Sequence, residues 1–238
     1  EKYPYLYETH LHTREASACA KNSAQEMVQA AKDYCYAGIF VTNHAWYGNT
    51  SVDRSLPWEE WVHGFCAPFY TAKAYGDQIG LSVFFGYESC YQGTEFLIYG
   101  VDEEWLLTHP EIKDATITEQ LQLVREQGGL VMHAHPFREE AYIPRVRLFP
   151  ELVDGVEGIN ATHSSHLSTS HNDPRFDERA IAYAREHDLP MSAGSDVHST
   201  LIRRRHCLSD AVSIGERLCG THPWQKRGLC TDERGSMV

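Results

Sequence analysis

Two histidines separated by one residue, His10 and His12, follow a short apolar stretch near the start of the chain. Side chains two residues apart in a strand point to the same face, so a strand ending here would aim both imidazoles at one point. The apolar segment 5–7 predicts such a strand, and α/β folds place their sites at the C-terminal ends of strands. Because neutral imidazole is a common metal ligand, the pair indicates a metal site; two solvent-facing histidines are the alternative.

Signals for helices and strands alternate along the sequence, which favours a TIM-like α/β barrel over an open sheet. Ser23 and Glu26 form a capping box at the start of a predicted helix, and Gly38 marks its end. The apolar run 39–42 then predicts a buried strand that leads into His44. We predict strands at about residues 5–7, 39–42, 81–85, 96–99, 130–132, 153–159 and 190–192.

The composition limits the functions that the chain can carry. A length of 238 residues suits a single barrel domain over residues 1–238, whose tail, 199–238, is poorly patterned. The net charge of −12 argues against binding long nucleic acids, and no apolar run is long enough to span a membrane. The cysteines are scattered, without a Cys-x-x-Cys motif or a signal peptide, which indicates reduced thiols and a cytoplasmic protein.

Histidines and acids follow five of the predicted strands. They are His10 and His12 after the first, then His44, Glu88 and His135, and finally Asp196 and His198. On one rim of a barrel these groups would converge, and mixed nitrogen and oxygen donors suit Zn²⁺, Mn²⁺ or Fe²⁺. One tetrahedral ion cannot use so many ligands, so we expect two or three divalent ions, with a carboxylate such as Glu88 bridging them.

The order of these motifs resembles the polymerase and histidinol phosphatase (PHP) superfamily. The motifs are His10-Leu-His-Thr, Thr42-Asn-His, Gly86-Tyr-Glu, Ala134-His-Pro-Phe-Arg, Val156-Glu-Gly-Ile-Asn and Gly194-Ser-Asp-Val-His. The resemblance covers residues 5–198 and implies a distorted seven-stranded (β/α)7 barrel with a two- or three-metal phosphoesterase site. It implies ligand roles for the histidines and acids named above, and it favours His135, which precedes a proline, over His133.

The sequence departs from the family pattern in three places, one of which is Asn43, where members commonly have an aspartate before the histidine. Many members have a ligand aspartate shortly after the first motif; here the nearest carboxylate is Glu15, which takes that role, with Ser17 as the alternative. Some members have a further histidine after the glutamate motif, where this chain has Glu95 and Phe96. A further ligand or a general acid is open among four residues of one loop: Asn160, His163, His166 and His171.

The resemblance implies hydrolysis of a small phosphate monoester, the expected partner molecule, by a hydroxide that metal ions generate. Arg138 follows the fifth predicted strand and is the candidate phosphate clamp, because a planar guanidinium matches phosphate oxygens. A surface ion pair is the alternative role for Arg138. His171 is the candidate general acid for the leaving group. The alternative is that His171 is a loop histidine without a catalytic role.

Three other functions fit the sequence less well. A phosphodiesterase or exonuclease on short oligonucleotides belongs to the same superfamily, but the acidic charge weighs against long nucleic acid. A metal-dependent amidohydrolase also opens with His-x-His, but it usually needs a carboxylated lysine in mid-barrel, where this chain has Glu88. The third is an inactive metal-binding module, against which the intact set of ligand residues argues.

Overall fold

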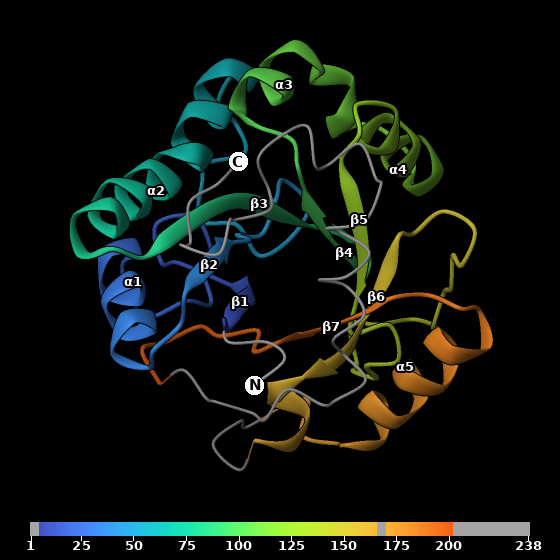
Figure 1. Ribbon diagram of the computed structural model, residues 1–238. Coiled ribbons are helices and arrows are strands. Elements are labelled where there is room, and N and C mark those ends of the chain that lie inside the picture. Colours follow the sequence, from blue (N-terminus) through green and yellow to red (C-terminus); the bar gives the residue numbers. More distant parts are fainter. Residues whose placement is uncertain (1–4, 166–169, 202–238) are drawn as a thin grey trace.

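A curled seven-stranded sheet forms the centre of the computed structural model, which describes residues 5–165 and 170–201 (Figure 1). The strands lie in chain order: β1 (Tyr7–Leu11), β2 (Gly38–Val41), β3 (Ser82–Tyr91), β4 (Thr94–Tyr99), β5 (Leu130–Ala134), β6 (Gly155–Asn160) and β7 (Met191–Gly194). β1 also contacts β7, and a parallel bridge joins Leu11 to Val197. The sheet is therefore a nearly closed barrel, and the predicted seven-stranded α/β barrel is confirmed.

The first strand directs the two opening histidines to the inside of the barrel. β1 ends at Leu11, further along the chain than the predicted segment 5–7, so His10 lies within the strand and His12 follows it directly. Both side chains are fully buried, and their ring centroids lie 5.0 Å apart. The spacing of two residues therefore brings the imidazoles together, as alternation in a strand requires.

An antiparallel hairpin interrupts the otherwise parallel barrel. β4 pairs antiparallel with both β3 and β5, whereas the other neighbouring strands are parallel. β3 runs on to Tyr91, past the predicted end at residue 85, because β4 pairs with it as far as Thr94. Gln92 and Gly93, with φ of 52° and 80°, form the two-residue turn that such a hairpin prefers. Glu88 therefore lies within a paired strand, which holds its backbone rigidly.

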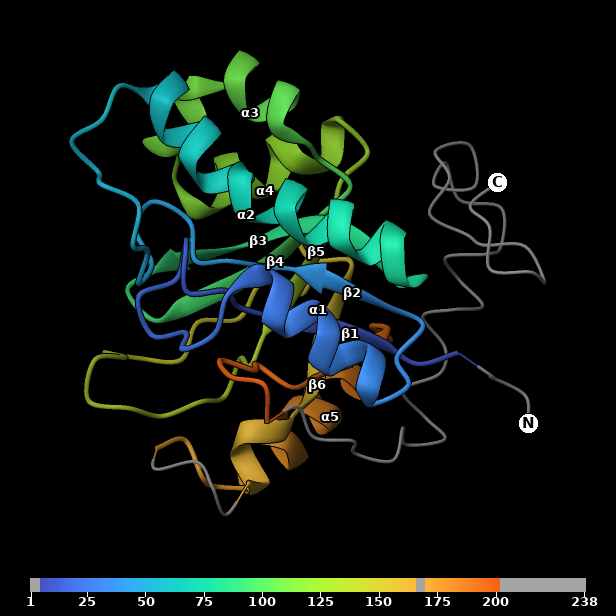
Figure 2. The ribbon, with the colours of Figure 1, turned by 90° about the vertical axis from the view of Figure 1, so that its left-hand side faces the viewer.

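Helices surround the barrel (Figure 1). They are α1 (Ala24–Asp33), α2 (Trp58–Ile79), α3 (Glu103–Thr108), α4 (Ile117–Glu126) and α5 (Arg175–Glu186), with 3₁₀ turns at Pro110–Lys113 and Ala161–Ser164. Figure 2 shows α2, α3 and α4 on one side of the sheet and α5 on the opposite side. The predicted capping box of Ser23 and Glu26 begins α1. Among residues 5–165 and 170–201, no helix has the length and apolar character needed to cross a membrane.

The interior of the molecule divides into an apolar part and a polar part. The largest apolar cluster includes Trp61 and Phe65 of α2, whose stacked rings lie 4.7 Å apart. Inside the barrel, in contrast, several buried side chains of the parallel strands are polar or charged, among them Glu8, His10 and Glu157. Buried charges are costly unless they are paired or bind metal ions, so this polar interior marks the candidate site.

Candidate metal centre

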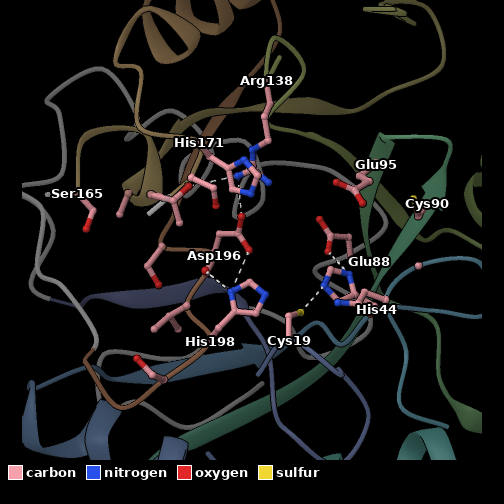
Figure 3. Close-up of a pocket in the computed structure, with 18 of the residues that line it drawn as sticks. Cys19, His44, Glu88, Cys90, Glu95, Arg138, Ser165, His171, Asp196 and His198 are labelled. Carbon is pink, nitrogen blue, oxygen red and sulfur yellow. Dashed lines mark hydrogen bonds and ion pairs between the residues drawn. The ribbon is translucent and has the colours of Figure 1, made fainter. Parts of the chain in front are cut away.

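The barrel brings seven of the eight residues that we expected as metal ligands to one place. They are His10 in β1, His12 after it, His44 after β2, Glu88 in β3, His135 after β5, and Asp196 and His198 after β7. All are buried except His198, which is partly exposed. Figure 3 shows His44, Glu88, Asp196 and His198 directed toward a common cavity. The C-terminal rim of the barrel thus holds one cluster of nitrogen and oxygen donors.

Glu88 lies at the centre of this cluster. Its Oε1 lies 3.3 Å from His10 Nε2 and 3.1 Å from His135 Nε2. Its Oε2 lies 2.7 Å from His44 Nδ1 and 3.6 Å from His12 Nε2. Each oxygen of one carboxylate therefore faces a different pair of imidazoles, which is the arrangement that a bridging carboxylate needs.

Asp196 provides the second carboxylate. Its Oδ1 lies 3.5 Å from His10 Nε2 and 3.3 Å from His12 Nε2, and its Oδ2 accepts a hydrogen bond from Arg138 Nη2 at 2.7 Å. Asp196 has a φ of 51° and His135 a φ of 28°, both unusual for residues other than glycine. Such backbone strain persists where the surroundings enforce it, commonly at functional sites.

Four overlapping groups of side chains are close enough to hold an ion. They are His12, His44 and His198; His10, His12 and Glu88; His10, His135 and Asp196; and His44, Glu88 and Glu95. Because the groups share members, they divide one cluster in different ways rather than marking four separate ions. No ligand role was predicted for Glu95 from the sequence, but its Oε2 lies 3.3 Å from His135 Nε2. The sequence signal was its position, where some members of the PHP superfamily have a further histidine, and in the structure it pairs with Cys90 in the β3–β4 hairpin.

The donor atoms of the cluster fit divalent metal ions. Four buried atoms face one another or a carboxylate at 2.7–3.6 Å without a well-aligned hydrogen bond among the described residues: His10 Nε2, His12 Nε2, His44 Nδ1 and Glu88 Oε2. Buried polar atoms that are close to opposite charges but poorly aligned for hydrogen bonds are only partly satisfied. Nitrogen and oxygen donors that converge in this way are what Zn²⁺, Mn²⁺ and Fe²⁺ bind, and such ions would satisfy all four atoms.

Glu157, for which the sequence analysis assigned no role, orients the ligands from behind. Its Oε1 lies 2.9 Å from His10 Nδ1, so the opposite nitrogen of that ring faces the cluster. Its Oε2 accepts hydrogen bonds from the backbone N–H of His135 and from Asn160 Nδ2. The sequence signal was its place in a buried strand, where a carboxylate needs a partner. A carboxylate that fixes the far nitrogen of a ligand histidine is common at metal sites.

Two further buried polar side chains fix the loops that carry the ligands. Glu8 accepts hydrogen bonds from the backbone N–H groups of His10 and Ser195, each at 2.9 Å, and so ties β1 to the loop after β7. Asn43 accepts hydrogen bonds from the backbone N–H of Thr13 and from Ser17 Oγ. These bonds connect distant parts of the chain around the cluster and reduce its freedom to move.

The charges of the cluster perturb its acid–base groups strongly. Burial lowers the pKa of His10, but the carboxylates of Asp196 and Glu157 outweigh this and raise it well above the usual value. Burial raises the pKa of Glu88, whereas the facing imidazoles lower it well below the usual range. Burial and neighbouring histidines lower the pKa of His12. The carboxylates are therefore ionised at neutral pH, as metal binding requires.

Glu15 does not reach the cluster, which corrects the expectation that it supplies a ligand. Its side chain is exposed, and both carboxylate oxygens face the backbone N–H of Ala24, at 3.1 and 3.2 Å. Glu15 thus compensates the partial positive charge at the start of α1. The alternative, Ser17, donates to Asn43 Oδ1 and accepts from the backbone N–H of His44, so its hydroxyl supports the ligand loops.

The two residues expected to act on the substrate both line the cavity beside the cluster. Arg138 is buried, and besides Asp196 it contacts Thr162 Oγ1 and His163 Nε2, each at 3.3 Å. The alternative that Arg138 is a surface residue is wrong, because its side chain is 5% exposed. His171 directs Nδ1 to Glu140 Oε1 at 2.7 Å.

The other loop candidates differ in their placement. Asn160 Nδ2 lies 3.3 Å from Asp196 Oδ2, so it belongs to the surroundings of the cluster. His163 is buried, and its Nδ1 lies 2.6 Å from Oδ1 of Asp177 in α5. Its ring therefore packs against that helix. His166 lies outside the described residues.

A thiol also lines the cavity. Cys19, in the loop between β1 and α1, has its Sγ 3.2 Å from His44 Nε2, as the dashed line in Figure 3 shows. Burial raises the pKa of this thiol, but hydrogen bonds from His198 and His44 outweigh that effect and lower the pKa to about 6. The two imidazoles therefore favour the thiolate form of this side chain.

Comparison with solved structures supports the fold. No family model matches the sequence, and no curated protein is similar to it. A two-domain protein from Bacteroides vulgatus, containing a predicted PHP-like metal-dependent phosphoesterase, superposes with a TM-score of 0.57 at 14% identity; the match covers 82% of this chain and 52% of that chain. The present chain thus spans about half the length of that protein.

Two further structures are similar to this chain. A protein from Bifidobacterium adolescentis, described as a metal-dependent phosphoesterase, has a TM-score of 0.58 at 15% identity, with coverage of 91% of this chain and 96% of that chain. An amidohydrolase from Chromobacterium violaceum, with bound sulfate and no metal, has a TM-score of 0.53 at 13% identity and coverage of 81% and 87%. The barrel is therefore of the kind found in PHP-like metal-dependent hydrolases.

Proposed function

We propose that this protein is a metal-dependent phosphoesterase that hydrolyses a small phosphate monoester at a site for two or three divalent ions. The observation that carries the proposal is the convergence of buried imidazole and carboxylate donor atoms at one place in the barrel. The order of the ligand motifs and the fold shared with PHP-like phosphoesterases support the same activity.

Two sides of the cluster would hold the ions. One side is rich in carboxylates and consists of His10, Glu88, His135 and Asp196. The other is rich in imidazoles and consists of His12, His44 and His198. When bound, divalent ions lower the pKa of a coordinated water and neutralise the charge of a phosphoryl group. Glu88, which faces both sides, would bridge them.

Arg138 and His171 are the two side chains that would act directly on the substrate, one by binding the phosphate group and the other by donating a proton. The Asp196 carboxylate holds one arm of the Arg138 guanidinium at 2.7 Å, which fixes the orientation of its planar fork at the wall of the cavity. A fork fixed in this way suits the oxygens of a phosphate group. Glu140 orients the His171 ring through Nδ1, so Nε2 is the nitrogen that would give a proton to the leaving alkoxide.

The cavity indicates a substrate with an organic part of moderate size. Its volume is about 850 Å³, far more than a phosphate group needs and within the range of small-molecule sites. Tyr47 and Tyr142, each about half exposed, lie in its wall and offer aromatic surface. The net charge of the protein is −12, so attraction of a phosphate ester depends on the local charges of the metal centre and Arg138.

A metal-dependent amidohydrolase is the second candidate, because one of the similar structures carries that name. The central position of the cluster favours the phosphoesterase. It is occupied by the Glu88 carboxylate, at the place where an amidohydrolase usually needs a carboxylated lysine.

A turnover screen tests the proposal. The protein, loaded with Mn²⁺ or Zn²⁺, is offered phosphate monoesters, phosphodiesters and amides in parallel. We expect phosphate release from monoesters, lost in Asp196→Asn and His10→Ala, and retained in the control His187→Ala at the exposed end of α5. Metal-loaded protein that cleaves only amides, or only diesters, would contradict the proposal, as would monoester hydrolysis that survives in both site variants.

A further inference from the structure

The imidazole-rich side of the cluster has a fourth donor that is not a histidine. The rings of His44, His12 and His198 form a stacked row, with centroid separations of 4.2 Å and 4.4 Å, and the outer two rings lie 6.0 Å apart. Cys19 contacts both outer rings, with its Sγ 3.2 Å from His44 Nε2 and a hydrogen bond to His198. Figure 3 shows the Cys19 side chain between His44 and His198, the two outer rings of the row.

We propose that Cys19 is a thiolate ligand that completes a tetrahedral site with His12, His44 and His198 and makes this side of the cluster selective for Zn²⁺. The inference rests on the proposed metal centre and deepens it by assigning different metals to its two sides. Three imidazoles and one thiolate form a ligand set that is typical of zinc, whereas the carboxylate-rich side offers harder oxygen donors that also suit Mn²⁺.

The distances agree with ligation of one ion. With zinc–sulfur and zinc–nitrogen bonds of about 2.3 and 2.1 Å, a sulfur and a nitrogen bound to the same tetrahedral zinc lie about 3.6 Å apart. The separation of 3.2 Å between Cys19 Sγ and His44 Nε2 is within a few tenths of an ångström of that value. The nitrogens of the three histidines lie within 4.8 Å of one another. His44 would bind through Nε2, while its Nδ1 stays 2.7 Å from Glu88 Oε2, and side-chain rotations would bring the other two nitrogens and the sulfur to the same centre.

A second observation is independent of the cysteine. His12 is fully buried, and its Nε2 makes no well-aligned hydrogen bond among the described residues, with Asp196 Oδ1 at 3.3 Å and Glu88 Oε2 at 3.6 Å. Its Nδ1 lies 3.3 Å from Ser17 Oγ, so Nε2 is on the opposite edge of the ring and faces the cluster. Coordination of a cation would satisfy this buried nitrogen better than the two distant carboxylate oxygens do.

The loop that carries Cys19 is attached to the loops that carry the two outer histidines. On one side of the cysteine, Ala18 donates its backbone N–H to Asn49 O at 2.8 Å, in the loop that follows His44. On the other side, Lys21 donates its backbone N–H to the carbonyl of His198 at 2.7 Å. The position of the sulfur is thus fixed relative to both rings by backbone hydrogen bonds, as an organised ligand site requires.

Substitution of cobalt for zinc tests the ligand role, because a cobalt–thiolate bond gives an intense near-ultraviolet charge-transfer absorption that nitrogen and oxygen ligands do not give. Reduced metal-free protein is titrated with Co²⁺, and the spectra of the wild type, Cys19→Ser and Cys90→Ser are compared. Cys90 is a matched control, since it lies in the same cavity beside Glu95. We expect the band in the wild type and in Cys90→Ser, and its loss in Cys19→Ser while the visible cobalt bands persist.

Metal preference is the second readout. Cys19→Asp keeps the negative charge but replaces a soft sulfur by a hard oxygen, so the preference for Zn²⁺ over Mn²⁺, measured by chelator competition, should fall by about tenfold or more. Zinc should also protect Cys19, but not the exposed Cys35, from alkylation, as peptide mass spectrometry can measure. Both measurements use folded protein, which circular dichroism verifies for each variant.

Any of the following outcomes would overturn the inference that Cys19 is a metal ligand. A charge-transfer band that persists in Cys19→Ser, or an unchanged metal preference in Cys19→Asp, would show that the sulfur is not a ligand, while the metal centre itself would stand. Loss of turnover in Cys19→Ser with an unaltered cobalt spectrum and zinc affinity would assign the thiol to the reaction instead. Failure of the wild type to bind cobalt or zinc at all would overturn both the ligand role and the proposed function.

Discussion

His10 Nδ1 lies 2.9 Å from Glu157 Oε1, and both side chains are fully buried. This contact links two strands that are far apart in the sequence, β1 and β6, and it decides which nitrogen of His10 faces the cluster. A buried carboxylate that holds a ligand histidine keeps the ring oriented and makes it a stronger donor. The arrangement of the metal centre therefore depends on groups that would not themselves touch an ion.

Glu157→Gln should weaken metal binding without unfolding the protein. The amide keeps the size of the side chain but loses the charge that holds His10, so we expect metal affinity to fall by about 10- to 100-fold. Isothermal titration with Zn²⁺ measures the change. Glu126→Gln, on the exposed end of α4, serves as the matched control and should bind as the wild type does. Equal affinities in the two variants would remove the orienting role of Glu157.

Gly194→Ala should damage the same contact by steric pressure. A Cβ at this position would overlap Glu157 Oε1 and would lie 2.7 Å from the Cβ of His10. We expect a loss of about 1–3 kcal/mol in the free energy of unfolding, together with weaker metal binding. In the control Gly64→Ala, the new Cβ meets only Val52 at 3.5 Å inside α2, so stability should be unchanged or higher. Denaturant unfolding of both variants makes the comparison, and equal stabilities would contradict the crowding described.

Arg138→Ala should raise KM for phosphate monoesters by about tenfold or more, because the substrate loses a fixed guanidinium at the wall of the cavity. Steady-state kinetics on metal-saturated enzyme measures this effect apart from any change in metal affinity. The control Arg179→Ala removes an exposed arginine of α5 that stacks over Phe137. The KM of this control variant should match that of the wild type. An unaltered KM in Arg138→Ala would show that Arg138 does not bind the substrate and that its role is limited to the contact with Asp196.

Alkaline pH should destabilise the fold through Cys66. Burial in α2, together with the charges of Glu103 and Asp102, raises the pKa of this thiol above its ordinary value of 9.0. The folded state therefore keeps a proton that the unfolded chain releases above about pH 9, so stability is complete below that pH and falls as pH rises, by up to about 1.4 kcal/mol per unit.

Thermal unfolding at pH 7 and at higher pH measures this effect. Cys66→Ala should show a smaller loss of stability between the two conditions than the wild type, whereas Cys35→Ser, which changes an exposed thiol, should show the same loss. If the thermal stability of all three proteins depended on pH in the same way, a group other than Cys66 would cause the alkaline sensitivity.

Sequence reasoning located most of the cluster because its logic is local. The alternation of a strand makes His10 and His12 neighbours, and parallel strands bring the residues that follow them to one rim. Glu88 was reached by the same reasoning, although it lies within β3 rather than at its end. The hairpin with β4 extends that strand, and it is the pairing across the hairpin that brings Glu95 into the cluster.

The residues that the sequence did not place correctly depend on the path of one loop. Glu15 and Cys19 both lie between β1 and α1, and a carboxylate is the more obvious ligand of the two. In the structure the loop turns Glu15 outward to the start of α1 and Cys19 inward to His44. Backbone hydrogen bonds to distant segments decide this path, and no local pattern encodes them.

The metal content of the folded protein tests the central claim most directly. Metal-free protein is reconstituted with Zn²⁺ or Mn²⁺, freed of excess ion, and measured by inductively coupled plasma mass spectrometry alongside the variant with His10→Ala and Asp196→Asn combined. The site described here predicts at least two ions bound per wild-type chain and a clear loss in the variant. A folded wild-type chain that retains no ion, or a variant that retains as many ions as the wild type, would contradict it.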